Sequence, residues 1–305
     1  MSTSRRTARQ PRWPVRSLYS PAADPVADEH PAPTPSTVAA SRAPVSGISA
    51  SWLHRVREGH ASDGPRFVFF PPAGSSASAA RPLLDAVPRE WEVWSAQYPS
   101  RGPRRRDPPA ESIRDMALTC LPELLEAAPG TVFGGHSFGA LLAYDVVQLL
   151  EQRGQAPAGL LVSSVPAPGT TLSDVAVEEL SDDALVASLR EQGATLPEVL
   201  ANDELMGLVL PALRSDLSLA RSYRDDHGRR LSTPVLGLGG RDDLLTSLEQ
   251  LLTWRHVTER WLGHILGEGG HFYYLHDPAP LTGALSRLRP SWPEWNPAPG
   301  RSGTP

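Results

Sequence analysis

The chain has 305 residues, a formal net charge of −5, and 40% hydrophobic residues. This length suits one large domain with tails or two small domains, and the hydrophobic content can build a sizeable core. The mild negative charge argues against nucleic acid as the main partner. No segment approaches 18 consecutive apolar residues, so we expect no membrane partner.

A single cysteine, Cys120, excludes an intramolecular disulfide and fits a reducing compartment. Arg5 and Arg6 form a twin-arginine pair, but the apolar stretch of an export signal does not follow them. We therefore expect a cytoplasmic protein.

The two ends of the chain lack a periodic apolar pattern. Residues 1–62 are rich in Pro, Ala, Ser, Thr and Arg, and such a composition buries too little surface to offset the entropy of ordering. We predict a disordered extension over residues 1–62 and a flexible tail over residues 291–305. Residues 63–290 then form one domain.

Within this domain, short apolar runs alternate with segments of helical spacing. The apolar runs, predicted as strands, are residues 66–71, 91–99, 131–135, 158–166, 233–240 and 260–270. The segments with helical spacing are residues 111–127, 138–154 and 281–290. This alternation predicts an α/β fold, with a mostly parallel sheet flanked by helices on both faces.

Residues 172–232 interrupt the alternation. Two helical segments, residues 180–193 and 203–226, lie there between successive strands. In an α/β enzyme such an insertion would form a lid over the site. Ordinary packing helices are the alternative, and the pattern alone does not decide between them.

The stretch GHSFG, Gly135 to Gly139, fits the pattern G-x-S-x-G around Ser137. The pattern alone is weak, but a predicted strand runs into it and a predicted helix runs out of it. This is the context of a nucleophile elbow, in which a serine occupies a strained turn between small residues. The N-terminus of the following helix would direct its free N–H groups at developing negative charge.

A serine nucleophile needs a histidine base held by a carboxylate, and in the elbow fold the chain order is serine, acid, histidine. His271 follows the last apolar strand in a glycine-rich loop, which makes it the preferred base. The acid is expected in Asp242 or Asp243, which follow the end of a strand; both could instead cap a helix. The other downstream histidines lie in helix-like or strand-like contexts or follow an apolar run: His227, His256, His264 and His276.

An oxyanion hole needs two backbone donors. One is expected from Phe138, directly after the serine, and the other from the loop after the first predicted strand. Pro71 and Pro72 have no N–H, so Ala73 is the first available donor in that loop. We expect no metal ion and no cofactor.

Six segments in this order resemble the type II thioesterases of polyketide and nonribosomal peptide pathways, which are stand-alone α/β-hydrolases. Departures from the family pattern are small: Pro72 stands where histidine is usual, and Ser75 and Ser100 stand where glycine is usual. The segments are "FFPPAGSSAS", "YPSRGPRRRD", "GGHSFGALLAYD", "LPALRSDLSLARSY", "GGRDDLL" and "GGHFYYL".

The resemblance implies an α/β-hydrolase fold with Ser137 as nucleophile, His271 as base, and Ala73 and Phe138 as oxyanion donors. The family spacing to a downstream tryptophan favours Asp243 over Asp242. It also implies the reaction: hydrolysis of acyl thioesters on the phosphopantetheine arm of an acyl or peptidyl carrier protein, which removes stalled or aberrant acyl groups from synthases. We expect a monomer.

Two alternatives remain open. One is a serine esterase or lipase that acts on oxygen esters with the same triad. The other is a catalytically inactive hydrolase-like protein that binds a synthase. Arg101, which matches a family arginine, is expected to hold its loop in place. The arginines at 104–106 could contact an acidic carrier protein, although a solvated loop is at least as plausible for most of them.

Overall fold

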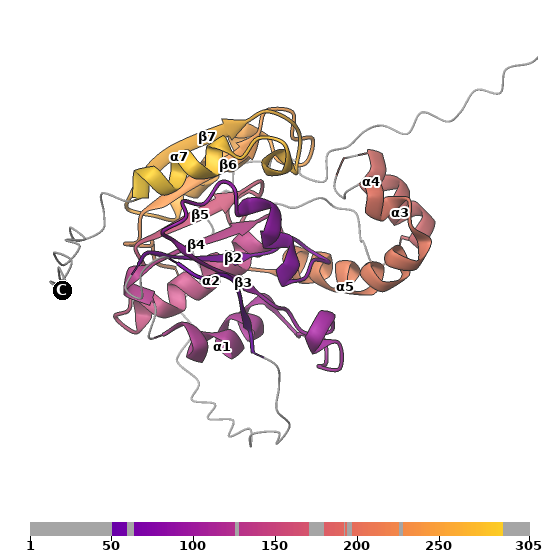
Figure 1. Cartoon of the computed structure of the whole chain (residues 1–305), viewed down its shortest axis with the longest axis horizontal. Helices are drawn as coiled ribbons and strands as arrows, with labels where there is room; N and C mark the ends of the chain where they lie inside the picture. The colour runs from indigo at the N-terminus through magenta and orange to yellow at the C-terminus, as the bar shows by residue number, and fades with distance from the viewer. Residues whose placement is uncertain are drawn as a thin grey trace, which may run out of the picture.

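The computed structural model describes residues 51–59, 64–125, 128–170, 180–191, 193, 197–225 and 228–288. These residues form an α/β fold around one seven-stranded sheet with the strand order β1-β3-β2-β4-β5-β6-β7 (Figure 1). Only β1 and β3 pair antiparallel, and the other neighbouring strands pair parallel. The mostly parallel sheet predicted from the sequence is confirmed. The strands are β1 (Leu53–Arg57), β2 (Arg66–Phe70), β3 (Glu92–Ala96), β4 (Thr131–His136), β5 (Gly159–Ser163), β6 (Val235–Gly240) and β7 (Trp261–Gly267).

Helices cover both faces of the sheet. In Figure 1, α1 and α2 lie on one side of the strands and α7 lies on the other. None of the helices in the described ranges has the length and apolar character of a membrane span. The α-helices are α1 (Ile113–Leu124), α2 (Phe138–Gln152), α3 (Asp182–Glu191), α4 (Pro197–Leu200), α5 (Asp203–Ser222), α6 (Leu248–Leu252) and α7 (Ala279–Leu288), and the 3-10 turns are η1 (Ala77–Leu83), η2 (Gly102–Arg104), η3 (Ala128–Gly130), η5 (Thr253–His256) and η6 (Tyr273–Leu275).

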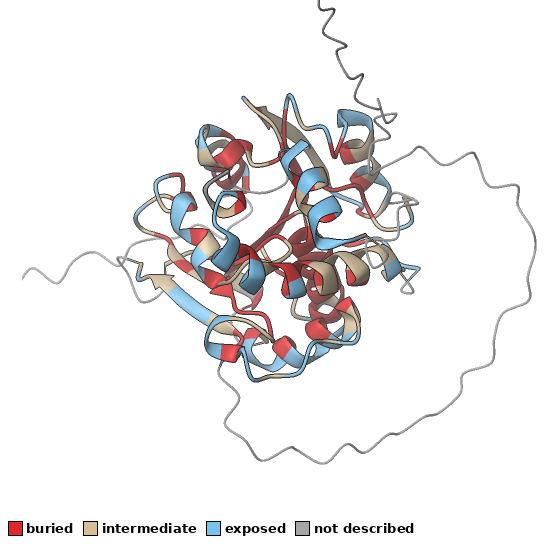
Figure 2. Ribbon diagram, turned by 90° about the vertical axis from the view of Figure 1, so that its right-hand side faces the viewer, coloured by how far each residue is buried: buried red, intermediate tan, exposed pale blue. Residues whose placement is uncertain are grey.

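The core has two main parts, one on each face of the sheet. Phe133 and Tyr144 belong to the part under α1 and α2, and Phe67 and Leu285 belong to the part under η1 and α7. Every residue of β4 is buried, as expected for a central strand with both faces covered. Figure 2 shows this arrangement, with buried strands inside a shell of partly exposed helices.

One strand lies where disorder was predicted. Residues Leu53–Arg57 form β1, and Trp52 beside it is buried and donates its N–H to Glu123 Oε1 at 2.9 Å. The prediction of disorder over residues 1–62 is therefore wrong for this stretch. Charged residues are common on edge strands because they discourage further pairing, and they hid the strand from a search for apolar runs. Residues 1–50, 60–63 and 289–305 lie outside the described residues.

The helices α3, α4 and α5 form an insertion between β5 and β6, and in Figure 1 they project to the right of the sheet. They share their own apolar cluster, in which Leu189, Met206 and Leu213 are buried. Ala73, from the loop after β2, packs against this cluster. The insertion therefore contacts a loop that was predicted to contribute to the site. Residues 171–179 lie outside the described part of the chain.

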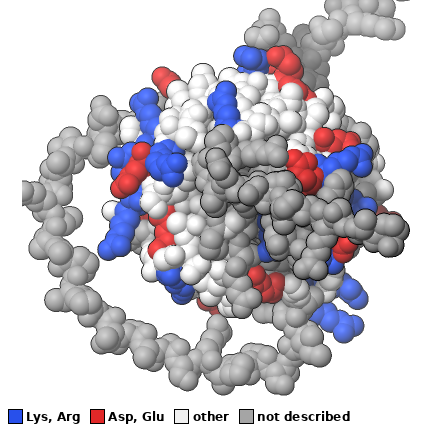
Figure 3. Space-filling view, turned by 60° about the vertical axis from the view of Figure 1, so that its left-hand side comes forward, with Lys and Arg blue, Asp and Glu red and all other residues white. Residues whose placement is uncertain are grey.

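Surface charge is mixed. On the face shown in Figure 3, positive and negative side chains are interspersed. All of the positive side chains are arginines, because the sequence contains no lysine.

Candidate active site

Four loops with predicted site residues follow β2, β4, β6 and β7. The carboxyl ends of parallel strands meet at one edge of a sheet, where ligands bind in open α/β folds. Ala73 follows β2, Ser137 follows β4, Asp243 follows β6 and His271 follows β7. The structure thus brings all of these segments to the same edge of the sheet.

Ser137 occupies the turn between β4 and α2. Its backbone angles are φ 53° and ψ −124°, a conformation with positive φ that costs a residue other than glycine about 1 kcal/mol. Its N–H donates to Ser163 O at 2.7 Å, which fixes the turn against β5. Although Ser137 is the N-cap of α2, its side chain makes no capping hydrogen bond. These features are those of a nucleophile elbow.

The glycines on either side of the serine allow the turn to close. A Cβ at Gly135 would lie 2.3 Å from Gly139 O, so β4 and the first turn of α2 could not approach each other. A Cβ at Gly139 would lie 2.0 Å from Phe70 O and 2.4 Å from Pro71 O. The second glycine therefore lets the start of α2 pack directly on the backbone that leads to Ala73.

His271 and Asp243 form a buried pair. His271 Nδ1 lies 3.2 Å from Asp243 Oδ1 and 3.1 Å from Asp243 Oδ2, and their side chains are only 4% and 1% exposed. Backbone contacts join the two loops, because Asp242 N–H donates to Gly269 O at 2.9 Å. A Cβ at Gly240 would lie 2.1 Å from Gly270 O, so the close approach of the loops also depends on glycine.

The two candidate aspartates differ in their surroundings. Asp243 points inward, and its Oδ1 also accepts the N–H groups of Leu245 at 2.9 Å and Thr246 at 3.2 Å. Asp242 is exposed. Neither caps the next helix, since α6 begins at Leu248 and Ser247 provides its capping box. Asp243 therefore holds the turn before α6 and contacts His271 at the same time.

The two predicted oxyanion donors lie on neighbouring segments. Phe138 is the first residue of α2, so its N–H is one of the four that have no partner within the helix. Ala73 lies in the loop that Gly139 contacts. The next N–H in that loop, from Gly74, donates to Asp216 Oδ2 on α5 at 2.8 Å. The Gly74 N–H is thus occupied by Asp216.

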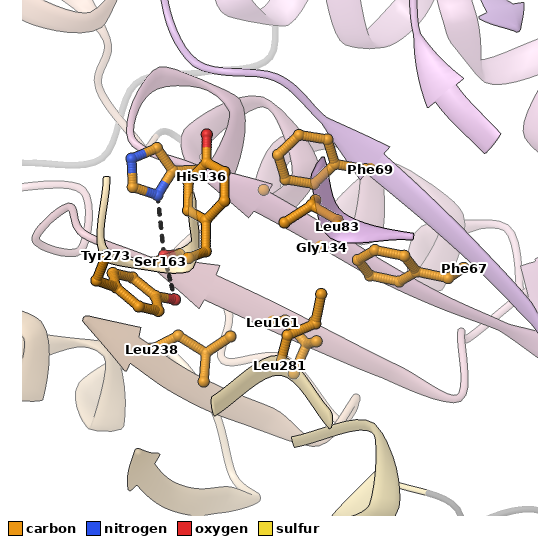
Figure 4. Close-up of a pocket in the computed structure, with 12 residues that line it drawn as sticks. Phe67, Phe69, Leu83, Gly134, His136, Leu161, Ser163, Leu238, Tyr273 and Leu281 are labelled. Carbon is orange, nitrogen blue, oxygen red and sulfur yellow. Dashed lines mark hydrogen bonds between the residues drawn. The ribbon is translucent and has the colours of Figure 1, made fainter. Parts of the chain in front are cut away.

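A polar chain below the site was not anticipated from the sequence. His136 Nδ1 lies 3.0 Å from Ser163 Oγ, which lies 3.0 Å from Tyr273 Oη; Figure 4 shows both contacts as dashed lines beside a mostly apolar cavity. The rings of His136 and His271 have centroids 4.8 Å apart. His136 occupies the first variable position of G-x-S-x-G, which is the one signal in the sequence that could have pointed to it.

The electrostatics of His136 follow from its burial. Desolvation, and after it the nearby His271, lower the pKa of His136 well below 6.5. His136 is therefore neutral near pH 7 and adds no positive charge beside His271. Burial likewise raises the pKa of Tyr273, so its hydroxyl stays protonated and can donate to Ser163.

Comparisons with known proteins identify the family of this chain. The sequence profile of the thioesterase domain family matches residues 65–290. The chain is 36% identical to the probable cadicidin biosynthesis thioesterase of Streptomyces griseus over 74% of its own length and 62% of the relative's, so it spans less than two thirds of that protein. It is also 36% identical to the thioesterase PikA5 of Streptomyces venezuelae, over 75% of this chain and 82% of that one.

A solved structure supports the same relationship. The type II thioesterase BorB, from the borrelidin biosynthetic cluster, superposes with a TM-score of 0.72 at 32% sequence identity and covers 79% of this chain and 99% of its own. The profile match spans most of the chain, and the relatives share both sequence and fold with it. The chain therefore belongs to the thioesterase domain family.

Proposed function

We propose that this protein is a type II thioesterase that hydrolyses acyl groups from the phosphopantetheine arm of acyl or peptidyl carrier proteins. One observation carries the proposal: a chain of the thioesterase domain family has a strained serine at the elbow, and a buried histidine–aspartate pair at the same edge of the sheet. The names of its relatives, a type II thioesterase among them, support this substrate class.

In the proposed acylation step, His271 Nε2 takes the proton of Ser137 Oγ as this oxygen attacks the thioester carbonyl. Asp243 accepts the Nδ1–H of His271, and this contact holds the imidazole in the tautomer that leaves Nε2 free. The tetrahedral intermediate then collapses. The carbon–sulfur bond breaks, and the phosphopantetheine sulfur leaves as a thiol with the proton from His271.

The N–H groups of Ala73 and Phe138 would stabilise the negative charge on the carbonyl oxygen. Because a thiolate is a good leaving group, attack and oxyanion stabilisation are the demanding parts of the reaction. In deacylation, His271 takes a proton from water, the hydroxide attacks the acyl carbon, and Ser137 Oγ leaves with that proton. The products are a free carboxylic acid and the original enzyme.

We further propose that α3, α4 and α5 form a lid over this site, supported by their contact with Ala73. The carrier protein is the proposed partner, and the exposed side chains of Arg105 and Arg106 are candidate contacts for its acidic surface. We place the protein in the cytoplasm as a monomer, and the buried free thiol of Cys120 is compatible with a reducing compartment.

The test uses carrier proteins loaded with acetyl or propionyl groups and, in parallel, p-nitrophenyl esters. Wild type should release the acid from the carriers, and Ser137→Ala should not. Rapid hydrolysis of the nitrophenyl esters with the loaded carriers left intact would instead identify an esterase of oxygen esters. No hydrolysis of either substrate would favour an inactive synthase-binding protein.

A further inference from the structure

Asp216 on α5 is a buried carboxylate that takes no part in the proposed chemistry. Its side chain is 2% exposed and accepts hydrogen bonds from two other segments. Gly74 N–H donates to Oδ2 at 2.8 Å, and Arg101 donates through Nη1 to Oδ2 and through Nη2 to Oδ1, the latter at 2.8 Å. A helix of the insertion, the loop after β2 and the loop after β3 therefore meet at one carboxylate.

Arg101 fixes this carboxylate from the side of the β3 loop. Its Nε donates to Pro99 O at 3.1 Å and its Nη1 also donates to Ser75 O at 3.4 Å. The guanidinium lies 5.3 Å from the centre of the Tyr98 ring, and Tyr98 donates its hydroxyl to Pro71 O at 2.8 Å. The β3 loop thus holds the loop of residues 71–75 on both sides of Ala73.

Helix α5 also packs directly on Gly74. The φ of Gly74 is +73°, and a Cβ there would lie 3.0 Å from Leu213 Cβ and 3.2 Å from Val209 Cγ1. A side chain at residue 74 would both strain the backbone and displace the helix. The sequence thus keeps this position free for α5, with Asp216 one turn beyond the contact.

The Gly74 N–H belongs to the peptide group that joins Ala73 to Gly74. Asp216 fixes the direction of this N–H. Only two rotations, φ and ψ of Ala73, then separate the fixed peptide plane from the plane that carries the Ala73 N–H. Bidentate ion pairs and charge-assisted hydrogen bonds are the most strongly oriented polar contacts in proteins. This cluster is therefore stiff enough to set the direction of a neighbouring peptide.

We propose that Asp216, held by Arg101, is a positioning residue that couples the seating of α5 to the oxyanion hole. When α5 is seated, its carboxylate orients the loop so that the Ala73 N–H faces the reacting carbonyl. When α5 moves away, the loop loses its acceptor and the hole loses a donor. The consequence is that the rate of the chemical step depends on α5, not on substrate binding alone. The inference rests on the proposed function.

The test compares Asp216→Leu and Asp216→Asn. Leucine removes every acceptor, so kcat on loaded carriers should fall by about a hundredfold, as when one oxyanion donor is lost. Asparagine retains one acceptor oxygen, but its NH₂ group faces an N–H donor. For this variant we expect kcat to fall by about tenfold. In both variants KM should change by less than about threefold, because the lost contact acts mainly in the transition state.

Asp182→Asn is the matched control. Asp182 on α3 pairs with Arg214 on α5 at 2.7 Å, so this variant also removes an ion pair of the insertion, but one that does not involve residues 71–75. Its kcat should stay near that of wild type. Melting temperatures identify any variant that does not fold, and the nearly isosteric Asp216→Asn decides the question if Asp216→Leu is unfolded.

A fluorophosphonate that labels serine nucleophiles gives a second measure, because its reaction with Ser137 also develops negative charge on an oxygen. The labelling rate should fall in the same order as kcat. Three results for folded Asp216→Asn would contradict the coupling of α5 to the oxyanion hole. They are a kcat and a labelling rate within about twofold of wild type, values equal to those of Asp182→Asn, or a change in KM alone. If wild type labels normally but leaves every loaded carrier intact, the proposed function fails while the labelling series still tests the coupling.

Discussion

The side chain of Asp243 faces His271 and the turn before α6 at once, with Oδ2 at 3.1 Å from His271 Nδ1 and Oδ1 accepting the N–H of Leu245 at 2.9 Å. A carboxylate that is fixed by backbone donors cannot rotate away from its histidine. The turn therefore supplies the rigidity that the proposed base His271 requires, whereas the neighbouring Asp242 is exposed.

Because only Asp243 contacts His271, substitution of the two aspartates should have different effects on kcat. Asp243→Asn should lower kcat by about 10²- to 10⁴-fold, because the amide cannot hold the imidazole in the required tautomer. Asp242→Asn is the matched control and should stay within about twofold of wild type, as expected for an exposed side chain. Steady-state hydrolysis of a loaded carrier measures both. Equal, small losses in the two variants would contradict the assignment.

The strands and helices of the core were predictable because their apolar patterns are local. β2, β4, β5 and the helix α2 after Ser137 all follow from runs of a few residues. β1 was missed because an edge strand with charged residues is stabilised by pairing with β3, which no local pattern records. The alternative that Asp242 or Asp243 caps the next helix is wrong, because α6 begins later and has Ser247 as its own cap.

The site was predictable in part. Ser137 and His271 stand in contexts that single them out, and the resemblance to a family added Asp243. The contacts of Asp216 with Gly74 and Arg101 join residues that are 142 and 115 positions apart. Only the folded chain brings them together. The same holds for the path from His136 through Ser163 to Tyr273, which spans three elements.

The glycine after Phe138 should be intolerant of any side chain. In Gly139→Ala the new Cβ would meet Phe70 O at 2.0 Å, so α2 must shift away from β2. We expect a loss of about 3 kcal/mol or more in the free energy of unfolding, together with loss of activity. Denaturant unfolding monitored by circular dichroism measures the first quantity.

Gly207→Ala provides the control for that substitution. Gly207 lies inside α5, and a Cβ at this position would have no atom of the described residues within 4 Å apart from its own helix, so alanine meets no clash with them. Alanine should raise the free energy of unfolding by about 0.5–1 kcal/mol, because it favours the helix over the unfolded chain. Equal destabilisation by the two substitutions would show that the close approach at Gly139 is not the cause.

The lowered pKa of His136 gives stability a pH dependence. Its ordinary pKa is 6.5, and the folded chain binds its proton only at lower pH. Between the lowered pKa of the folded chain and 6.5, the unfolded chain binds more protons than the folded chain. The contribution of neutral His136 to stability is therefore fully present above about pH 6.5 and is lost as the pH falls towards the lowered pKa. The melting temperature of wild type should therefore fall more between pH 7 and pH 5 than that of His136→Gln.

The same residue can be followed directly. In a nuclear magnetic resonance titration of the imidazole signals, those of His136 should not shift between pH 8 and pH 6, since the ring stays neutral throughout. Signals of His136 that titrate at pH 6.5 would show that burial does not govern this group.

We propose that Ser137 carries the acyl group from the carrier to water. Rapid mixing with acetyl-loaded carrier, acid quenching and mass spectrometry of the digested protein test it most directly. We predict an acetyl adduct on the peptide that contains Ser137, formed as the carrier loses its acetyl group and absent in Ser137→Ala. Loss of acetyl from the carrier at the wild-type rate in Ser137→Ala, or an adduct on another residue, would contradict it.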